Sequence, residues 1–123
     1  MATHPLITVV DDDESVRESL PDLLKEFGFE ARTFSSAEDF LASESIAETR
    51  CLVLDVAMPG MTGPDLQREL TRRDQSIPIV FITAHRDAAL RPRLIDQGAV
   101  DCLLKPFEPT DLLQALHTAL QAS

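Results

Sequence analysis

Four short apolar segments of this chain each end at a polar residue, and this pattern limits the possible folds more than any other feature. The segments are three to five residues long and rich in Val, Ile and Leu, which is typical of strands buried on both faces of a parallel sheet. They cover residues 6–10, 51–54, 79–82 and 102–104, and they are followed by Asp11, Asp55, Thr83 and Lys105. The carboxyl ends of parallel strands meet at one edge of the sheet, where ligands bind. The sequence therefore predicts that carboxylates, a hydroxyl and an ammonium group share one pocket.

Amphipathic segments between these strands predict helices. Residues 16–27 carry apolar side chains at helical spacing, and Gly28 follows where a C-terminal cap belongs. Residues 30–34 predict a weaker strand. Further helices are expected after Ser36, with Asp39 completing a capping box, after Thr62, before Gly98 and from Pro109. The sum is an α/β fold of five strand–helix units, with a doubly wound parallel sheet covered on both faces.

Two prolines disturb the predicted helices. Pro21 lies inside the first helical pattern, where it removes the bond to the carbonyl of Arg17 at a cost on the order of 3 kcal/mol. The apolar spacing continues past it, so we expect one kinked helix. Pro92 leaves two alternatives. A helix beginning at Asp87 would hold this proline in its interior, whereas one beginning near Pro92 would hold it in the first turn and leave residues 88–90 in the loop.

Length, charge and cysteine positions narrow the class of protein. The 123 residues are expected to form one domain, and the net charge of -10 opposes binding to nucleic acids and anionic membranes. No apolar stretch approaches the roughly 20 residues that span a bilayer, and the first residues lack a signal-peptide core, so we expect a cytoplasmic protein. Cys51 and Cys102 lie in strands that are not neighbours if residues 79–82 lie between them. Two strand spacings, roughly 10 Å, are too long for a disulfide, so both thiols are expected to be reduced.

Asp11, Asp12 and Asp55 form a predicted acidic cluster. At about 4 Å and an effective dielectric constant near 20, each pair of carboxylates costs on the order of 4 kcal/mol. A hard cation can neutralise such a cluster, and Mg²⁺ suits a few carboxylates, a carbonyl and waters, with positions left for a phosphoryl group. The simpler explanation is that residues 11–14 cap and solvate the next helix, and we expect Asp13 to do only that. The place of Asp55 at the end of a second strand favours the metal site.

Thr83 and Lys105 complete the predicted pocket. The hydroxyl could donate to a phosphoryl oxygen, and the ammonium group could place a positive charge against another. Each also has a common explanation, as a strand-end threonine and as a lysine whose stem lies on apolar surface. Pro106 directly after Lys105 predicts a fixed loop, for which a cis bond is one solution.

Four motifs follow the polar strand ends in order along the chain. They are Val10-Asp11-Asp12, residues 54–63 (Leu-Asp-Val-Ala-Met-Pro-Gly-Met-Thr-Gly), Ile82-Thr83-Ala84 and Lys105-Pro106-Phe107. With these motifs the chain resembles the receiver domain of two-component response regulators, and segments 36–41 and 98–101 are most similar to the FixJ/NarL branch of that family. The resemblance covers the chain from end to end. It implies a flavodoxin-like, CheY-like (βα)5 sandwich with strand order 2-1-3-4-5.

The resemblance also implies a role for each matching position. Asp55 would accept the phosphoryl group, with Asp12 binding Mg²⁺ directly and Asp11 binding it largely through water. The remaining contacts would come from the carbonyl of Ala57 to the metal, and from Thr83, the Ala84 N–H and Lys105 to the phosphoryl group. Attack by the Asp55 carboxylate on phosphorus, with metal and lysine offsetting charge on the oxygens, agrees with the chemistry of phosphoryl transfer.

The family's function follows from this site. The donor is a phosphohistidine on a sensor histidine kinase, and receivers also catalyse their own phosphorylation from small donors and the loss of the phosphoryl group, without other enzymatic activity. Phosphorylation is expected to shift the fourth helix, fifth strand and fifth helix between two states and to control homodimerisation or an attached domain. In the FixJ/NarL branch a DNA-binding domain usually follows. The chain is therefore expected to be either a single-domain regulator or the receiver part of a longer transcription factor.

Two positions depart from the family pattern or modulate it. Many receivers carry an aromatic residue in the fifth strand that moves inward with the threonine, and here that position is Cys102. Leu103 or the loop would have to repack instead. His85, two residues after Thr83, is expected to lie over the acyl phosphate and to make its hydrolysis depend on pH between about 6 and 7.5, although a solvent-facing loop histidine is the simpler explanation.

Three other functions are compatible with parts of this pattern. A Mg²⁺-dependent phosphatase with an aspartyl nucleophile needs a second acid two residues later, where this chain has Ala57. A flavin-binding flavodoxin needs hydroxyls and glycine after the first strand, where this chain has three aspartates. A receiver-like module that binds proteins without phosphorylation remains the alternative, and the presence of all five chemical positions argues against it.

Overall fold

A computed structural model describes residues 4–121 of the chain and contains a five-stranded parallel sheet in the order β2-β1-β3-β4-β5. The predicted fold class and strand order are therefore confirmed. The strands are β1 (Leu6–Val10), β2 (Glu30–Phe34), β3 (Cys51–Asp55), β4 (Ile79–Thr83) and β5 (Asp101–Leu104). The helices are α1 (Glu14–Glu26), α2 (Ala37–Leu41), α3 (Gly63–Arg72), α4 (Leu90–Asp96) and α5 (Pro109–Gln121), with a short 3₁₀ helix at Glu44–Ala47.

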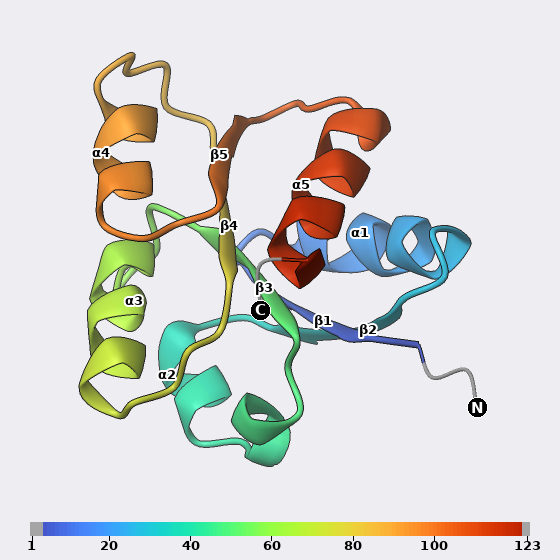
Figure 1. Ribbon diagram of the computed structural model, residues 1–123, viewed down its shortest axis with the longest axis horizontal. Coiled ribbons are helices and arrows are strands. Elements are labelled where there is room, and N and C mark those ends of the chain that lie inside the picture. Colours follow the sequence, from blue (N-terminus) through green and yellow to red (C-terminus); the bar gives the residue numbers. More distant parts are fainter. Residues whose placement is uncertain (1–3, 122–123) are drawn as a thin grey trace.

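Helices cover both faces of the sheet, as the uninterrupted apolar strands predict. Helices α1 and α5 pack on one face, and α2, α3 and α4 pack on the other (Figure 1). Alternate strand residues feed the two cores: Val9 and Val53 face α1 and α5, whereas Val10 and Leu54 face the opposite helices. All strands except β2 and β5 are buried along their whole length.

The strand register brings the polar strand ends to one edge of the sheet. Val10 is the register partner of Leu54, so Asp11 and Asp55 follow or end adjacent strands at the same level. Thr83 is the register partner of Leu104, and Lys105 follows directly. The convergence predicted from the apolar segments is present in the structure.

Capping residues define the start of the helices that leave this edge. The Asp13 side chain accepts a hydrogen bond from the Ser15 N–H at the start of α1, as expected for a residue that only caps. The Ser36 hydroxyl accepts from the Asp39 N–H, and Thr62 forms a reciprocal capping box with Asp65. The loops at the functional edge are therefore fixed by local sequence.

Both prolines lie within helices, Pro21 in the interior of α1 and Pro92 in the first turn of α4. Helix α1 is continuous through Pro21, which confirms a single helix. Helix α4 begins at Leu90, so Pro92 is its third residue and lies in the first turn. The alternative that began this helix at Asp87 is wrong, because a proline is tolerated only where its missing N–H has no helical partner. The other alternative placed Leu90 in the loop, whereas Leu90 is the first helical residue.

Both cysteines are unpaired, as the positions of their predicted strands indicated. Cys51 in β3 and Cys102 in β5 are both free and buried, with β4 between their strands. Among residues 4–121, no helix is long and apolar enough to cross a membrane.

Candidate functional site

Three carboxylates meet where β1 and β3 end. Oxygen atoms of Asp11, Asp12 and Asp55 lie within 4.8 Å of one another. Asp11 and Asp55 are buried, and Asp12 is exposed, so the cluster opens to solvent at one side. A set of hard oxygen donors of this kind, open on one side, fits Mg²⁺, which retains several waters when it binds to proteins.

Internal donors already hold Asp11. Its Oδ1 accepts from the Asp13 N–H at 2.9 Å, and its Oδ2 accepts from the Lys105 Nζ at 2.8 Å. Because both carboxylate oxygens have donors, Asp11 is suited to holding a metal through bound water rather than directly. Asp12 is the exposed acid of the same turn and is suited to direct contact.

Asp55 carries a carboxyl group that is costly to ionise in the metal-free protein. Burial is the main cause, and the nearby Asp11 carboxylate adds to it; together they raise the pKa of Asp55 to about 7 from an ordinary value of 3.8. Lys105 opposes this rise, but its Nζ is 3.8 Å from Asp55 Oδ1, farther than from Asp11. A cation bound beside Asp55 would favour the ionised, nucleophilic form.

Lys105 is placed by the end of β5 and by the turn that follows. Its backbone N–H donates to the carbonyl of Thr83 at 2.7 Å, which joins the ends of β4 and β5. The peptide bond to Pro106 is cis, one of the solutions that the sequence allowed. The ammonium group lies within reach of both buried acids.

Thr83 ends β4 and is almost fully buried, while Ala84 and His85 are exposed in the loop that follows. The Thr83 hydroxyl accepts from the His85 N–H at 3.0 Å. To donate to a phosphoryl oxygen, the hydroxyl would keep this bond as acceptor or lose it by rotation.

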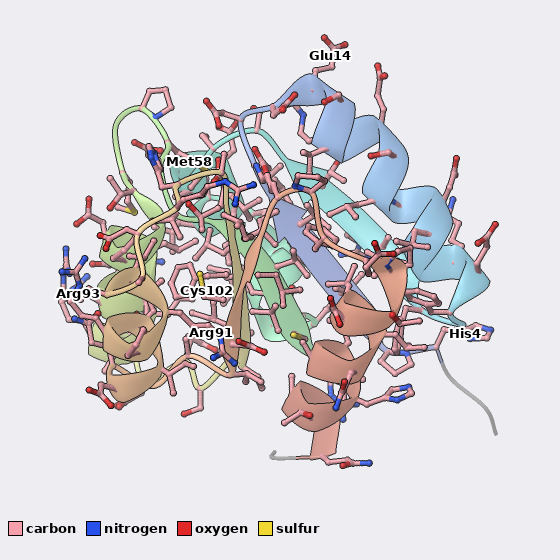
Figure 2. The ribbon with its side chains drawn as sticks, turned by 90° about the horizontal axis from the view of Figure 1, so that it is seen from above. His4, Glu14, Met58, Arg91, Arg93 and Cys102 are labelled. Atoms are coloured by element: carbon pink, nitrogen blue, oxygen red, sulfur yellow. The ribbon has the colours of Figure 1, made fainter. Side chains whose placement is uncertain are left out.

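Beside Thr83 lies a cavity of about 360 Å³ between the β4–α4 loop, α4 and β5. Cys102 and Leu104 line it, and Figure 2 shows Cys102 between α4 and the sheet with Arg91 near it. Leu103 packs instead in the core that faces α1 and α5. Because side chains alternate along a strand, Leu104, and not Leu103 as expected, is the leucine placed to repack in this cavity when Thr83 moves. Burial raises the pKa of the Cys102 thiol to about 11, so it is a neutral apolar lining group.

The β3–α3 loop carries Ala57, which is exposed and lies two residues after Asp55 in the chain. Two contacts that sequence reasoning missed fix this loop. The Glu38 carboxylate of α2 accepts from the Met61 N–H at 3.1 Å. Gly63 lies so close to β3 that a Cβ there would be 2.4 Å from the Asp55 carbonyl oxygen. The glycine was visible in the sequence, but only the fold reveals what it approaches.

Replacing Gly63 by alanine should lower the free energy of unfolding by about 2 kcal/mol, within the range for overpacked positions. The cause is overlap with the Asp55 carbonyl and with the Phe81 ring, which would be 2.9 Å from the new methyl group. Urea unfolding followed by circular dichroism measures the change. A midpoint equal to that of the wild type would contradict the close approach.

A third missed residue is Arg17, whose guanidinium Nη1 donates to the Asp11 carbonyl at 3.0 Å. The sequence placed Arg17 in a predicted helix but did not indicate this contact, because a side-chain bond between residues six positions apart across a turn has no characteristic sequence pattern.

Comparisons with known proteins agree with this geometry. A family model described as response regulator receiver domain matches residues 7–117. Nodulation protein W of Bradyrhizobium diazoefficiens is 44% identical over 120 residues, which cover 98% of this chain and 53% of that protein. The transcriptional regulatory protein FixJ of Azorhizobium caulinodans is 36% identical over 117 residues, which cover 95% of this chain and 56% of that protein. The chain thus spans about half the length of these curated relatives.

Among solved structures, FixJ-N has a TM-score of 0.86 and 37% identity, covering 100% of this chain and 98% of that chain. Sequence, fold and the arrangement of acids, threonine and lysine at one sheet edge lead to the same assignment. The chain belongs to the response regulator receiver domain family of two-component systems, and its relatives are regulators of the FixJ/NarL type.

Proposed function

We propose that Asp55 accepts a phosphoryl group from a phosphohistidine of a sensor histidine kinase, and that this modification switches the output of the chain. The observation that carries the proposal is the convergence of Asp11, Asp12, Asp55, Thr83 and Lys105 at one edge of the sheet. A buried carboxylate beside further acids and an ammonium group is suited to accept phosphorus and unsuited to bind flavin or nucleic acid.

Each side chain has a distinct part in the proposed transfer. An oxygen of Asp55 forms a bond to phosphorus while the bond to the donor nitrogen breaks and its electron pair leaves with the imidazole. Thr83 and the Ala84 N–H donate to the phosphoryl oxygens, and Lys105 neutralises one of them. Mg²⁺, held by Asp12, Asp55 and the Ala57 carbonyl and through water by Asp11, would supply positive charge against the remaining oxygen.

Lys105 has to change partners during this reaction. Its Nζ is 2.8 Å from Asp11 and 3.8 Å from Asp55 in the unphosphorylated chain. A phosphoryl group on Asp55 brings negative charge toward Lys105, and this attraction favours a shift of the ammonium group away from Asp11. The same group attracts the Thr83 hydroxyl and so couples the site to the cavity lined by Cys102.

The proposed output face consists of α4, β5 and α5. Arg91 in α4 and Asp101 in β5 form an ion pair at 2.8 Å, so α4 is tied to β5 beside the cavity. Movement of Thr83 would disturb this contact and shift the face toward a form that pairs with a second copy or releases an attached domain. We propose that residues 1–123 form one receiver domain and that this domain acts in the cytoplasm. Its output would be the control of transcription through an attached or partner DNA-binding domain.

Metal removal tests the proposal. Incubation with a small acyl phosphate and Mg²⁺ should add one phosphoryl group to the intact chain, as measured by mass spectrometry, and the adduct should disappear over time by self-catalysed hydrolysis. With EDTA in place of Mg²⁺ the adduct should be absent, because the clustered carboxylates then repel the donor. An unmodified chain in Mg²⁺, with hydrolysis slowed by cold, would instead favour a module that binds proteins without phosphorylation.

We also propose that His85 tunes the lifetime of the phosphoryl group. His85 lines the Thr83 cavity together with the charged groups Arg86, Asp87 and Arg91. The hydrolysis rate should differ between pH 6 and pH 7.5 in the wild type, because an imidazole changes charge in this range. The difference should vanish in His85→Ala. Loss of the adduct can be followed by intact mass at both pH values, and an equal pH ratio in wild type and variant would remove His85 from this role.

A further inference from the structure

Arg17 contacts both ends of the acidic turn formed by residues 11–13. Its backbone N–H donates to the Asp13 carbonyl at 3.2 Å within the first turn of α1. Its guanidinium Nη1 reaches back and donates to the Asp11 carbonyl at 3.0 Å. Asp12 therefore lies between two carbonyl groups, those of Asp11 and Asp13, that both accept hydrogen bonds from Arg17.

The bond from Arg17 completes the set of donors around Asp11. The two carboxylate oxygens of Asp11 accept from the Asp13 N–H and from Lys105, and its carbonyl oxygen accepts from Arg17. The Asp11 N–H in turn donates to the Phe34 carbonyl at 3.2 Å. Every polar atom of Asp11 thus has a hydrogen-bond partner. The freedom that remains to the exposed carboxylate of the next residue, Asp12, is chiefly the rotation of its own side chain.

Helix energetics do not explain a cation at this position. Arg17 lies near the N-terminus of α1, where the helix dipole disfavours positive charge. Glu14 at the first position has the sign that the dipole favours. The half-buried guanidinium is instead explained by the carbonyl that it binds, and a planar fork of donors suits such a fixed contact.

We propose that Arg17 is a positioning residue for Asp12, fixing the peptide between Asp11 and Asp12 so that the Asp12 carboxylate is presented to Mg²⁺. This inference rests on the metal site of the proposed function. Groups that orient metal ligands from behind typically contribute 10- to 100-fold to metal affinity.

A purely electrostatic role of Arg17 predicts the opposite change in Mg²⁺ affinity when the residue is replaced. A guanidinium near a divalent cation repels it, so removing the charge would tighten Mg²⁺ binding. Positioning predicts weaker binding when the contact is lost, whether or not the charge remains. Arg17→Lys separates the two effects, because lysine keeps the charge and lacks the planar fork.

The experiment is a Mg²⁺ titration of the full chain, with the amide signals of residues 11–13 followed by NMR. Wild type, Arg17→Ala, Arg17→Lys and the control Arg93→Ala are compared; Arg93 is an exposed arginine of α4. Both Arg17 variants should bind Mg²⁺ about tenfold more weakly, and Arg93→Ala should bind as the wild type does. In phosphorylation assays the loss should appear in the Mg²⁺ concentration for half-maximal rate, with the rate at saturating Mg²⁺ retained.

Tighter or unchanged binding by Arg17→Ala and Arg17→Lys would overturn the proposal, as would a wild-type chain that binds no Mg²⁺. Urea unfolding in EDTA checks that the variants fold; if the alanine variant does not, Arg17→Lys carries the test. A chain that binds Mg²⁺ but accepts no phosphoryl group would refute the proposed function, while the titration would still decide the role of Arg17.

Discussion

Asp55→Asn should abolish incorporation of a phosphoryl group from a small acyl phosphate, whereas Asp74→Asn should leave it unchanged. The two variants make the same chemical change at different places. Asp55 ends β3 inside the acidic cluster, and Asp74 lies in the exposed turn after α3. Intact mass spectrometry after incubation with donor and Mg²⁺ measures the adduct in each.

The expected loss follows from the chemistry of the side chain. A carboxylate oxygen carries the charge that attacks phosphorus, and a neutral carboxamide lacks both that charge and comparable nucleophilicity. The control is well matched because Asp74 has a φ of 59°, a left-handed conformation that asparagine adopts as readily as aspartate. Full incorporation in Asp55→Asn would assign the acceptor to another residue and contradict the proposed chemistry.

Asp55→Asn should also stabilise the metal-free protein above pH 7. The pKa of Asp55 is about 7 in the folded chain and 3.8 as an ordinary carboxyl, because burial and the Asp11 carboxylate penalise its charge. A raised pKa in the folded state means that the contribution of this group is favourable below pH 4 and is lost as pH rises from about 4 to 7. At 1.36 kcal/mol per pKa unit, the loss amounts to about 4 kcal/mol at most.

Urea unfolding in EDTA at pH 5 and pH 8 measures this effect. The wild type should lose stability between the two pH values, Asp55→Asn should lose less, and the variant should be the more stable protein at pH 8. Asp74→Asn should follow the wild type. Mg²⁺ at pH 8 should restore stability to the wild type and to Asp74→Asn, which keep the acidic cluster, but not to Asp55→Asn, since a ligand that binds the folded state stabilises it. Equal pH dependence in wild type and Asp55→Asn would show that Asp55 carries no such cost.

The sequence was sufficient for the sheet because its strands are continuous apolar runs with polar ends. Asp11, Asp55, Thr83 and Lys105 each follow or end such a run, and a parallel sheet gives their convergence without any knowledge of side-chain packing. Caps at Asp13 and Thr62 were equally visible, because capping depends on residues three or fewer positions apart.

Features that depend on contacts between distant segments were not predictable in the same way. Local spacing does not determine where α4 starts, because its first residue, Leu90, is buried in the core that faces α3, and spacing along the chain does not encode that contact. The 3₁₀ helix at Glu44–Ala47 has a local cap from Ser43, but it also depends on a distant segment, because the Arg32 guanidinium of β2 donates to the Ser45 hydroxyl at 3.0 Å. The contact from Arg17 to Asp11 crosses a turn, and it follows neither the helical nor the strand periodicity by which contacts can be predicted from a sequence.

Locating the phosphoryl group tests the central claim most directly. Borohydride reduction of the phosphorylated chain converts an acyl-phosphorylated aspartate to homoserine, and peptide mass spectrometry then identifies the position. Homoserine at position 55 alone is the predicted result. Homoserine at Asp11 or Asp12, or a stable adduct on His85 that resists reduction, would contradict the assignment of Asp55 as the acceptor.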